Sequence, residues 1–226
     1  VRGSTGSRQE TARILVGLDE TLQKVIFQKE GNLNSLGEAL DFPLKPYTRY
    51  WYTVAVRTEH GEEAVSQPCF FETGKLDEPW DGQWLGVEDG DTHPEFQKTL
   101  TLPEKPRSAR LYICGLGLFE AYINGEKAGD DLLAPFLNDY TEHFQYCTYD
   151  VTSLLAEDNT LSVLLGDGWY RGHFGLGEPT HYDRPLALIA ELRMEFADGH
   201  TETLCSDSGW QYRSSFTTLS DIYNGE

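Results

Sequence analysis

The chain has 226 residues, of which 39% are hydrophobic and 12% aromatic, so it can form packed cores and is not a disordered segment. Its formal net charge of −19 makes nucleic acid and membrane surfaces poor partners, because phosphate backbones and anionic lipids repel an acidic protein. No stretch approaches the roughly 20 apolar residues that are needed to cross a bilayer.

The first predicted domain covers residues 1–75. Alternating apolar residues predict strands at 11–17 and 50–56, and residues 69–73 are expected to form the last strand. Residues 44–50 have the spacing L-x-P-x-T-x-Y, which resembles the tyrosine corner of fibronectin type III domains. We therefore expect a fibronectin type III-like sandwich, truncated or rearranged at its first strand, with Tyr50 as a structural anchor.

The boundary segment, residues 74–91, is rich in Gly, Asp and Pro and contains Trp80 and Trp84. Two tryptophans in a linker indicate that it is pinned against a neighbouring sandwich. The alternative is that these rings are exposed and stack on sugars.

The second predicted domain, residues 76–226, is an antiparallel β-sandwich of the jelly-roll, galactose-binding-like kind, truncated at its C-terminal end. No convincing amphipathic helix appears in it, and Asp150 is a candidate N-cap for a short turn or helix. The strands are predicted at residues 109–114, 118–123, 146–149, 161–165, 188–196, 201–205 and 210–212.

Asn124 and Gly125 follow the strand at 118–123 and predict a hairpin. A type I′ turn needs positive φ at both central residues, which Asn tolerates and Gly accepts freely. Because Asp would preserve this turn chemistry, Asn124→Asp is expected to be nearly silent.

The four cysteines, Cys69, Cys114, Cys147 and Cys205, have no CxxC or Cys/His spacing. Free core thiols are favoured over disulfides, which indicates a reducing compartment and a cytoplasmic location. Both ends of the sequence read as cuts, so a periplasmic or secreted location stays open.

Several runs in a fixed order resemble the N-terminal part of bacterial α-L-rhamnosidases. The upstream runs P-L-K-P-Y-T-R-Y-W-Y-T-V-A-V-R and F-F-E-T-G are similar to the fibronectin-like module of that family. The sandwich runs are R-S-A-R-L-Y-I-C-G-L-G-L-F-E-A-Y-I-N-G-E-K-A-G-D, L-A-P-F-L-N-D-Y, Q-Y-C-T-Y-D-V-T-S-L-L and L-L-G-D-G-W-Y-R-G. The chain departs from the family at Phe136-Leu137, where the family tends to have Gly-Trp.

This resemblance implies an accessory region of a glycoside hydrolase that releases terminal α-L-rhamnose with inversion. The catalytic carboxylates would lie on an (α/α)₆ barrel further along the chain, absent from these residues, so the chain alone is expected to be non-catalytic. Its partners would be that downstream barrel and a rhamnose-containing glycan or glycoside. One alternative is an autonomous module that binds such glycans with the help of calcium, and another is an adhesion or signalling sandwich.

Two loops hold candidate ligand-binding residues. Asp167, Trp169, Tyr170 and Arg171 suit a sugar, since rings stack on it and charged groups bind hydroxyls. The competing interpretation is that the rings pack the end of the sandwich and Asp167 pairs with Arg171.

The second loop offers oxygens that could bind calcium, which takes 6–8 oxygen ligands. Turn formation and solvated loops explain such residues more often than calcium binding does. A further polar group, His143, His173, His181 and Asp183, matches no metal spacing. The candidate calcium ligands are Asp130, Asp131, Asn138 and Asp139.

Overall fold

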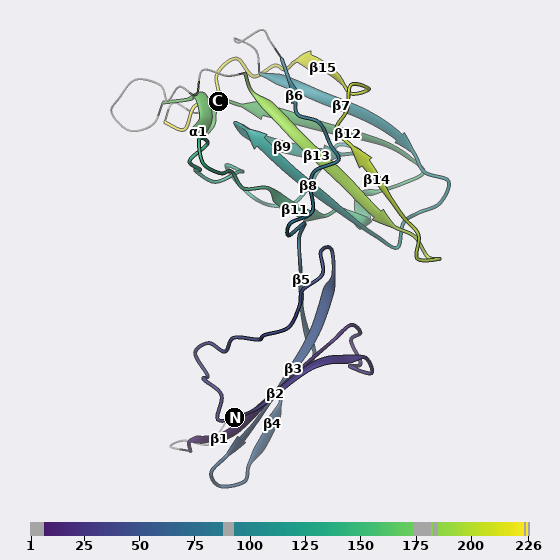
Figure 1. Cartoon of the computed structure of the whole chain (residues 1–226). Coiled ribbons are helices and arrows are strands. Elements are labelled where there is room, and N and C mark those ends of the chain that lie inside the picture. The colour runs from purple at the N-terminus through teal and green to yellow at the C-terminus, as the bar shows by residue number, and fades with distance from the viewer. Residues whose placement is uncertain (1–6, 88–92, 174–181, 183–184, 224, 226) are drawn as a thin grey trace. The chain divides into compact units, whose positions relative to one another are not determined.

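The parts of the chain that the computed structural model describes are residues 7–87, 93–173, 182, 185–223 and 225. Two compact units, Val1–Pro79 and Trp80–Glu226, make up the chain (Figure 1). Antiparallel strands supply nearly all of the described regular structure, which confirms the all-β fold class. Within the described residues, no helix is long and apolar enough to cross a membrane.

The first unit contains the strands β1 (Gln9–Gly17), β2 (Val25–Gly31), β3 (Arg49–Thr58), β4 (Glu63–Val65) and β5 (Cys69–Glu72). They form one antiparallel sheet in the order β2-β1-β3-β4, and β5 pairs with the first half of β3. All five described strands lie in this sheet, since β5 joins it at β3 instead of opening a second layer.

Tyr50 anchors the inner face of this sheet. Its side chain is 1% exposed, and its hydroxyl accepts a 2.8 Å hydrogen bond from the backbone N–H of Lys45. The ring stacks on Phe71, with 5.2 Å between centroids, and meets Phe42 edge-on. These contacts confirm the predicted tyrosine corner, in which a buried hydroxyl satisfies the backbone of the preceding turn.

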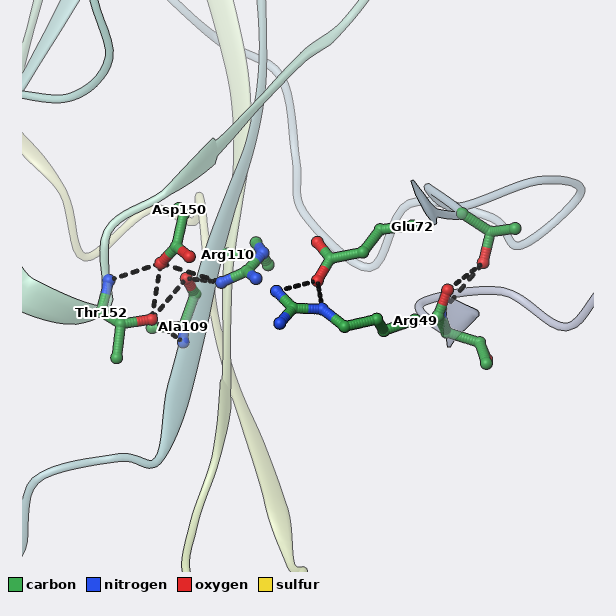
Figure 2. A network of polar contacts seen from close by, with 8 residues as sticks. Arg49, Glu72, Ala109, Arg110, Asp150 and Thr152 are labelled. Atoms are coloured by element: carbon green, nitrogen blue, oxygen red, sulfur yellow. Dashed lines mark hydrogen bonds and ion pairs between the residues drawn. The ribbon is translucent and has the colours of Figure 1, made fainter. Parts of the chain in front are cut away.

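The opposite face of β3 carries a polar pair. Arg49 Nε donates to Glu72 Oε1 at 2.6 Å (Figure 2), across the strand pair β3 and β5. The guanidinium carbon also lies 4.1 Å from the ring centroid of Phe70. Both charged side chains are partly exposed, so the ion pair contributes little to the stability of the sheet. We infer that its main effect is to fix the register in which β5 pairs with β3.

The second unit is a sandwich of two sheets, which Figure 1 shows lying face to face. Its strands are β6 (Leu85–Gly86), β7 (Pro94–Thr101), β8 (Ser108–Leu116), β9 (Leu118–Ile123), β10 (Glu126–Lys127), β11 (Cys147–Asp150), β12 (Asp158–Gly166), β13 (Ala187–Glu195), β14 (Thr201–Cys205) and β15 (Gln211–Ser214). One sheet has the order β10-β9-β12-β7-β15 and the other β11-β8-β13-β14, with β6 paired to β13. A 3₁₀ turn, η1 (Thr152–Leu154), and a single-turn helix, α1 (Gly168–Arg171), are the described helical elements of this unit.

One apolar core fills the space between these two sheets. Ile113 of β8 and Leu192 of β13 belong to the same buried cluster as Phe119 of β9 and Val163 of β12. Along β9, buried residues alternate with partly exposed ones, because successive side chains of a strand point to opposite faces. The sandwich therefore keeps a second, outward face on β9 and β12.

The boundary segment is attached to the second unit by hydrogen bonds. Glu191 of β13, which is 3% exposed, accepts from the backbone N–H groups of Asp81 at 2.6 Å and Gly82 at 3.1 Å. The Ser206 hydroxyl donates to the Gln83 carbonyl at 2.7 Å, and the Ser206 carbonyl accepts from Gln83 N–H at 2.7 Å. We call this set of bonds the Glu191 staple.

Both tryptophans of the boundary segment pack on the same stretch of the second unit. Trp80 meets Tyr146 edge-on, with centroids 5.7 Å apart, and Trp84 meets Phe144 in the same way at 5.4 Å. These contacts confirm the expectation that the rings pin the segment against a sandwich, and Trp84 keeps 40% of its surface exposed.

The hairpin after β9 has the predicted backbone, with φ of 55° at Asn124 and 83° at Gly125. The Asn124 side chain does more than tolerate this turn. Its Nδ2 donates to Leu154 O and to Asn159 Oδ1, both at 3.0 Å, and its Oδ1 accepts from Thr160 N at 2.9 Å. The expectation that Asn124→Asp is nearly silent is therefore wrong, because a carboxylate cannot donate either bond.

The end of β11 is fixed by a polar corner (Figure 2). Asp150 Oδ1 accepts from Thr152 N at 3.1 Å and Oγ1 at 2.6 Å, and lies 2.9 Å from Arg110 Nη1. The Thr152 hydroxyl accepts from Ala109 N at 2.8 Å. The residue that caps η1 is Val151, so the prediction of Asp150 as N-cap is wrong. Asp150 instead bonds two residues ahead, as Asp commonly does in turns.

All four cysteines are free, as predicted. Cys114 is buried, and burial raises the pKa of its thiol to about 12. Cys69, by contrast, is exposed and is not a core residue.

Candidate functional site

The loop after β12 is held close to β9 by glycine. Gly168 has φ of +46°, and a Cβ at this position would lie 2.1 Å from Cγ of Leu118. Only a residue without a side chain lets α1 approach the strand this closely. The glycines of this loop thus have a packing role, and they bring Asp167 to the end of the sandwich.

Asp167 joins this loop to two other segments. Its Oδ2 lies 3.0 Å from Nε2 of His93, and its Oδ1 lies 3.5 Å from Nε of Arg171. Nδ1 of His93 lies 3.2 Å from the Thr217 carbonyl oxygen. Both ring nitrogens therefore face acceptors, an arrangement that only the doubly protonated imidazolium satisfies. The hydrogen bond to Asp167 outweighs the opposing effect of burial and raises the pKa of His93.

Tyr170, one of the two aromatic residues predicted to bind sugar, is occupied by packing. Tyr170 is 1% exposed and stacks on Tyr182, with centroids 5.4 Å apart and planes 4° from parallel. Tyr140 meets both of these rings edge-on, at 5.0 and 5.2 Å. Trp169 is half-buried. Tyr170 consequently presents no ring face to a ligand in this conformation.

Of the four residues predicted to bind sugar, the structure brings Asp167 and Arg171 together as an ion pair and places Tyr170 in the core. The side chains of Asp167 and Arg171 keep 22% and 25% of their surface exposed, so they still reach solvent. This geometry can hold the end of the sandwich rigid. A sugar-binding role for Asp167, Trp169, Tyr170 and Arg171 stays a prediction.

A second carboxylate at this end of the unit, Asp221, is not indicated by any sequence pattern. Its side chain is 3% exposed, and its Oδ2 lies 2.9 Å from Nδ1 and 2.6 Å from the backbone N of His173. The two residues are 48 positions apart, so no local motif signals the pair. Of the other residues in the predicted polar group, His181 and Asp183 lie outside the described residues.

Three of the four candidate calcium ligands, Asp131, Asn138 and Asp139, are used in turns and packing. Asp131 Oδ2 accepts from the Tyr149 hydroxyl at 3.0 Å. Asn138 Oδ1 accepts from Gln145 N at 3.2 Å, and Asp139 Oδ1 accepts from the Thr141 hydroxyl at 2.6 Å. Across the part of the chain that the structure describes, no three His, Cys, Asp or Glu side chains are grouped to hold a metal ion. Calcium binding by Asp130, Asp131, Asn138 and Asp139 stays a prediction.

Two family models match the chain, one in each unit. The family described as Alpha-L-rhamnosidase N-terminal domain matches residues 104–226. The family described as Rha78A-like, N-terminal immunoglobulin domain matches residues 1–77.

Individual relatives show the same likeness. An α-L-rhamnosidase from Streptomyces avermitilis is 42% identical over 134 residues, covering 58% of this chain and 13% of that protein. Another from Formosa agariphila is 29% identical over 216 residues, covering 81% of this chain and 23% of that protein. The crystal structure of the native Aspergillus terreus α-L-rhamnosidase is similar with a TM-score of 0.85 and 29% identity, over 97% of this chain and 27% of that one. The chain thus spans less than a quarter of these two curated relatives.

Proposed function

Because the chain belongs to the family of α-L-rhamnosidase N-terminal domains, we propose that it is the accessory, non-catalytic N-terminal region of an inverting α-L-rhamnosidase. Its role is structural, as a platform that packs against a downstream catalytic barrel and shapes the approach to its cleft.

The observation that carries this proposal is the share of each relative that the chain matches. The likeness to the Aspergillus terreus enzyme extends over 97% of this chain but over only 27% of that enzyme. The unmatched remainder has room for a catalytic domain. Two units built from antiparallel strands, the second with one apolar core, suit a supporting region.

The chemistry of inversion explains why catalysis would belong to the barrel and a supporting role to this chain. An inverting glycosidase holds a general acid and a general base roughly 6.5–9.5 Å apart, so that water enters between them. Under this proposal both carboxylates belong to the downstream barrel. Residues of this chain act by position: the Glu191 staple fixes the boundary segment, and the Asp167–His93 pair fixes the end of the sandwich.

Hydrolysis of an aryl α-L-rhamnoside tests the proposal directly. We expect the purified chain to release no more phenol than a mock-purified control, and we expect the sequence following residue 226 in the gene to encode a helical barrel. Clear turnover by the chain itself, or a gene without such a barrel, would refute the accessory role.

The alternative is an autonomous module for rhamnose-containing glycans, assisted by calcium. Its support is the partial exposure of Asp167 and Arg171 at the end of the sandwich. Titration of the chain with L-rhamnose, with and without calcium, separates the two functions. Saturable binding that Asp167→Asn abolishes would favour the module, whereas a silent titration favours the platform.

A further inference from the structure

The outward face of the sheet β10-β9-β12-β7-β15 is hollowed into a groove. Two adjoining hollows, of about 230 and 260 Å³, share Leu164 and Thr217 in their walls. The larger is also lined by Glu95, Tyr122 and Ser162, which come from three different strands. Their joint size is that of a site for a small ligand.

Strand register sets the chemistry of the groove floor. Leu164 of β12 is opposite Glu120 of β9 on one side and Glu95 of β7 on the other. Two residues away on the same face, Ser162 is opposite Tyr122. Because neighbouring strands are spaced about 4.8 Å apart, the backbones carrying the two glutamates are roughly 10 Å apart. The floor of the groove at Leu164 is thus apolar and has a carboxylate on each side. Further along the strands, the floor presents the hydroxyl of Ser162 and the aromatic ring of Tyr122.

Each carboxylate is balanced by one cation. Lys127 Nζ lies 2.5 Å from Glu120 Oε1, and the Tyr122 hydroxyl donates to Glu120 Oε2 at 2.5 Å. Arg213 Nη2 lies 2.7 Å from Glu95 Oε2. A carboxylate can accept about four hydrogen bonds, so these groups keep acceptor capacity while the groove gains little net charge.

Phe216 forms part of the wall of the larger hollow although its side chain is 98% exposed. A ring in that position contributes almost no packing energy to the fold. It can, however, cover the C–H face of a bound ring, as Tyr122 can from the floor.

We propose that this groove binds a neutral pyranose ring of a glycan. Paired carboxylates accept hydrogen bonds from hydroxyl groups, and Leu164 with the two aromatic rings covers the apolar face of the sugar. An anionic ligand is disfavoured by the chain's net charge of −19. The larger hollow contains no residue of the loop that holds Asp167, whereas the smaller hollow adjoins that loop at Gly166. The proposal does not depend on the parent enzyme.

The groove is suited to binding without hydrolysis. Burial acts to raise the pKa of Glu120, but hydrogen bonds from Lys127 and Tyr122 outweigh it and hold that pKa below its ordinary value. The general acid of a glycosidase needs the opposite shift.

Ligand-observed NMR on the whole chain tests the groove. The probes are the methyl pyranosides of L-rhamnose, D-galactose and D-glucose, with sodium D-glucuronate as the charged comparator. We expect at least one neutral pyranoside to bind saturably, and glucuronate to bind at least tenfold more weakly. Phe216→Ala and Ser162→Val should each weaken binding at least fivefold, and Phe216→Ala should leave the melting temperature unchanged.

Two control variants separate this groove from other surfaces. Phe136→Ala removes another exposed ring, and Asp167→Asn alters the loop, so both should bind the pyranoside as the wild type does. The proposal is overturned if no neutral pyranoside binds, if glucuronate binds equally well, or if both groove variants keep wild-type affinity. Loss of binding in Asp167→Asn alone would also overturn it and assign the sugar to the loop. None of these outcomes bears on the aryl rhamnoside test.

Discussion

The hydroxyl of Tyr50 lies in a buried turn and accepts a hydrogen bond from the backbone N–H of Lys45. This bond takes the place of the one that the N–H makes to water in the unfolded chain. We expect Tyr50→Phe to lower the free energy of unfolding of the first unit by about 1 kcal/mol, since Lys45 N–H loses its acceptor. Chemical denaturation followed by tryptophan fluorescence measures this change. Tyr52→Phe, the same change on the same face of β3 but at a partly exposed ring, is the control. Equal stability of Tyr50→Phe and the wild type would argue against the corner.

Asn124 carries a second prediction at the scale of one side chain. Asn124→Asp keeps the backbone turn but places a carboxylate against Leu154 O and Asn159 Oδ1, which both lose a donor. We expect a loss of about 1–3 kcal/mol in the free energy of unfolding at neutral pH. Urea denaturation at pH 7 and at pH 4 measures it, with a smaller loss expected at pH 4, where Asp begins to be protonated. A variant as stable as the wild type at both pH values would contradict this account.

His93 gives the chain a predictable response to pH. Its pKa is raised above 6.5 in the folded chain, so the fold binds this proton more tightly than the unfolded chain does. The stabilisation is therefore complete below about pH 6.5 and is lost as the pH rises through the folded pKa. We expect the stability difference between wild type and His93→Gln to shrink steadily between pH 6 and 9. His200→Gln, at an exposed turn, is the control, and a difference that does not vary with pH would contradict the prediction.

At the scale of elements, helix α1 depends on Gly168. Both Gly168 and Gly125 have positive φ, so a side chain at either position strains the backbone. At Gly168 the added methyl would also clash with the Leu118 side chain, whereas at Gly125 no atom lies within 4 Å of it. We expect Gly168→Ala to cost about 2–4 kcal/mol and Gly125→Ala about 1 kcal/mol. Thermal denaturation compares the two. Leu118→Ala should partly rescue Gly168→Ala but not Gly125→Ala, and equal costs at the two glycines would count against the close approach of α1.

Local patterns account for most of the strands. The apolar run at 161–165 and the alternation at 188–196 correspond to β12 and β13, because each carries a strand-length hydrophobic signal. The central strand β7 is not predicted, since it begins at a proline and alternates polar residues with only Phe96 and Leu100. Its place is decided by partners far away in the sequence, along β12 and β15.

The polar sites are harder to predict from the sequence than the strands are, because their residues are brought together only by the tertiary structure. Asp167 is identifiable from its loop, but His93 lies 74 positions away and no spacing links them. Glu95 and Arg213 in the groove are separated by 118 positions. Such pairs form only when strand register and sheet order are settled, so a motif search finds the loop and misses the groove.

Over the whole molecule, the reactivity of the four thiols tests which cysteines the fold buries and whether any of them form a disulfide. We expect Ellman's reagent to label Cys69 rapidly in the native chain, because it is exposed. Cys114 should react only after unfolding, because burial raises the pKa of its thiol to about 12. Denatured protein should titrate four thiols without reductant, and Cys69→Ser should remove the fast phase. A count below four would reveal a disulfide.

The Glu191 staple and β7 together decide where the second unit can be cut out and moved into another protein. The family match in this unit starts at residue 104, yet β7 ends at Thr101 and lies between β12 and β15. A transplant that starts at 104 would leave β12 with an open edge and Glu191 with its carboxylate buried and lacking two donors. One that starts at Trp80 carries both features with it. For protein engineers, and for recombination between genes, the transferable piece is therefore about two dozen residues longer than its family signature.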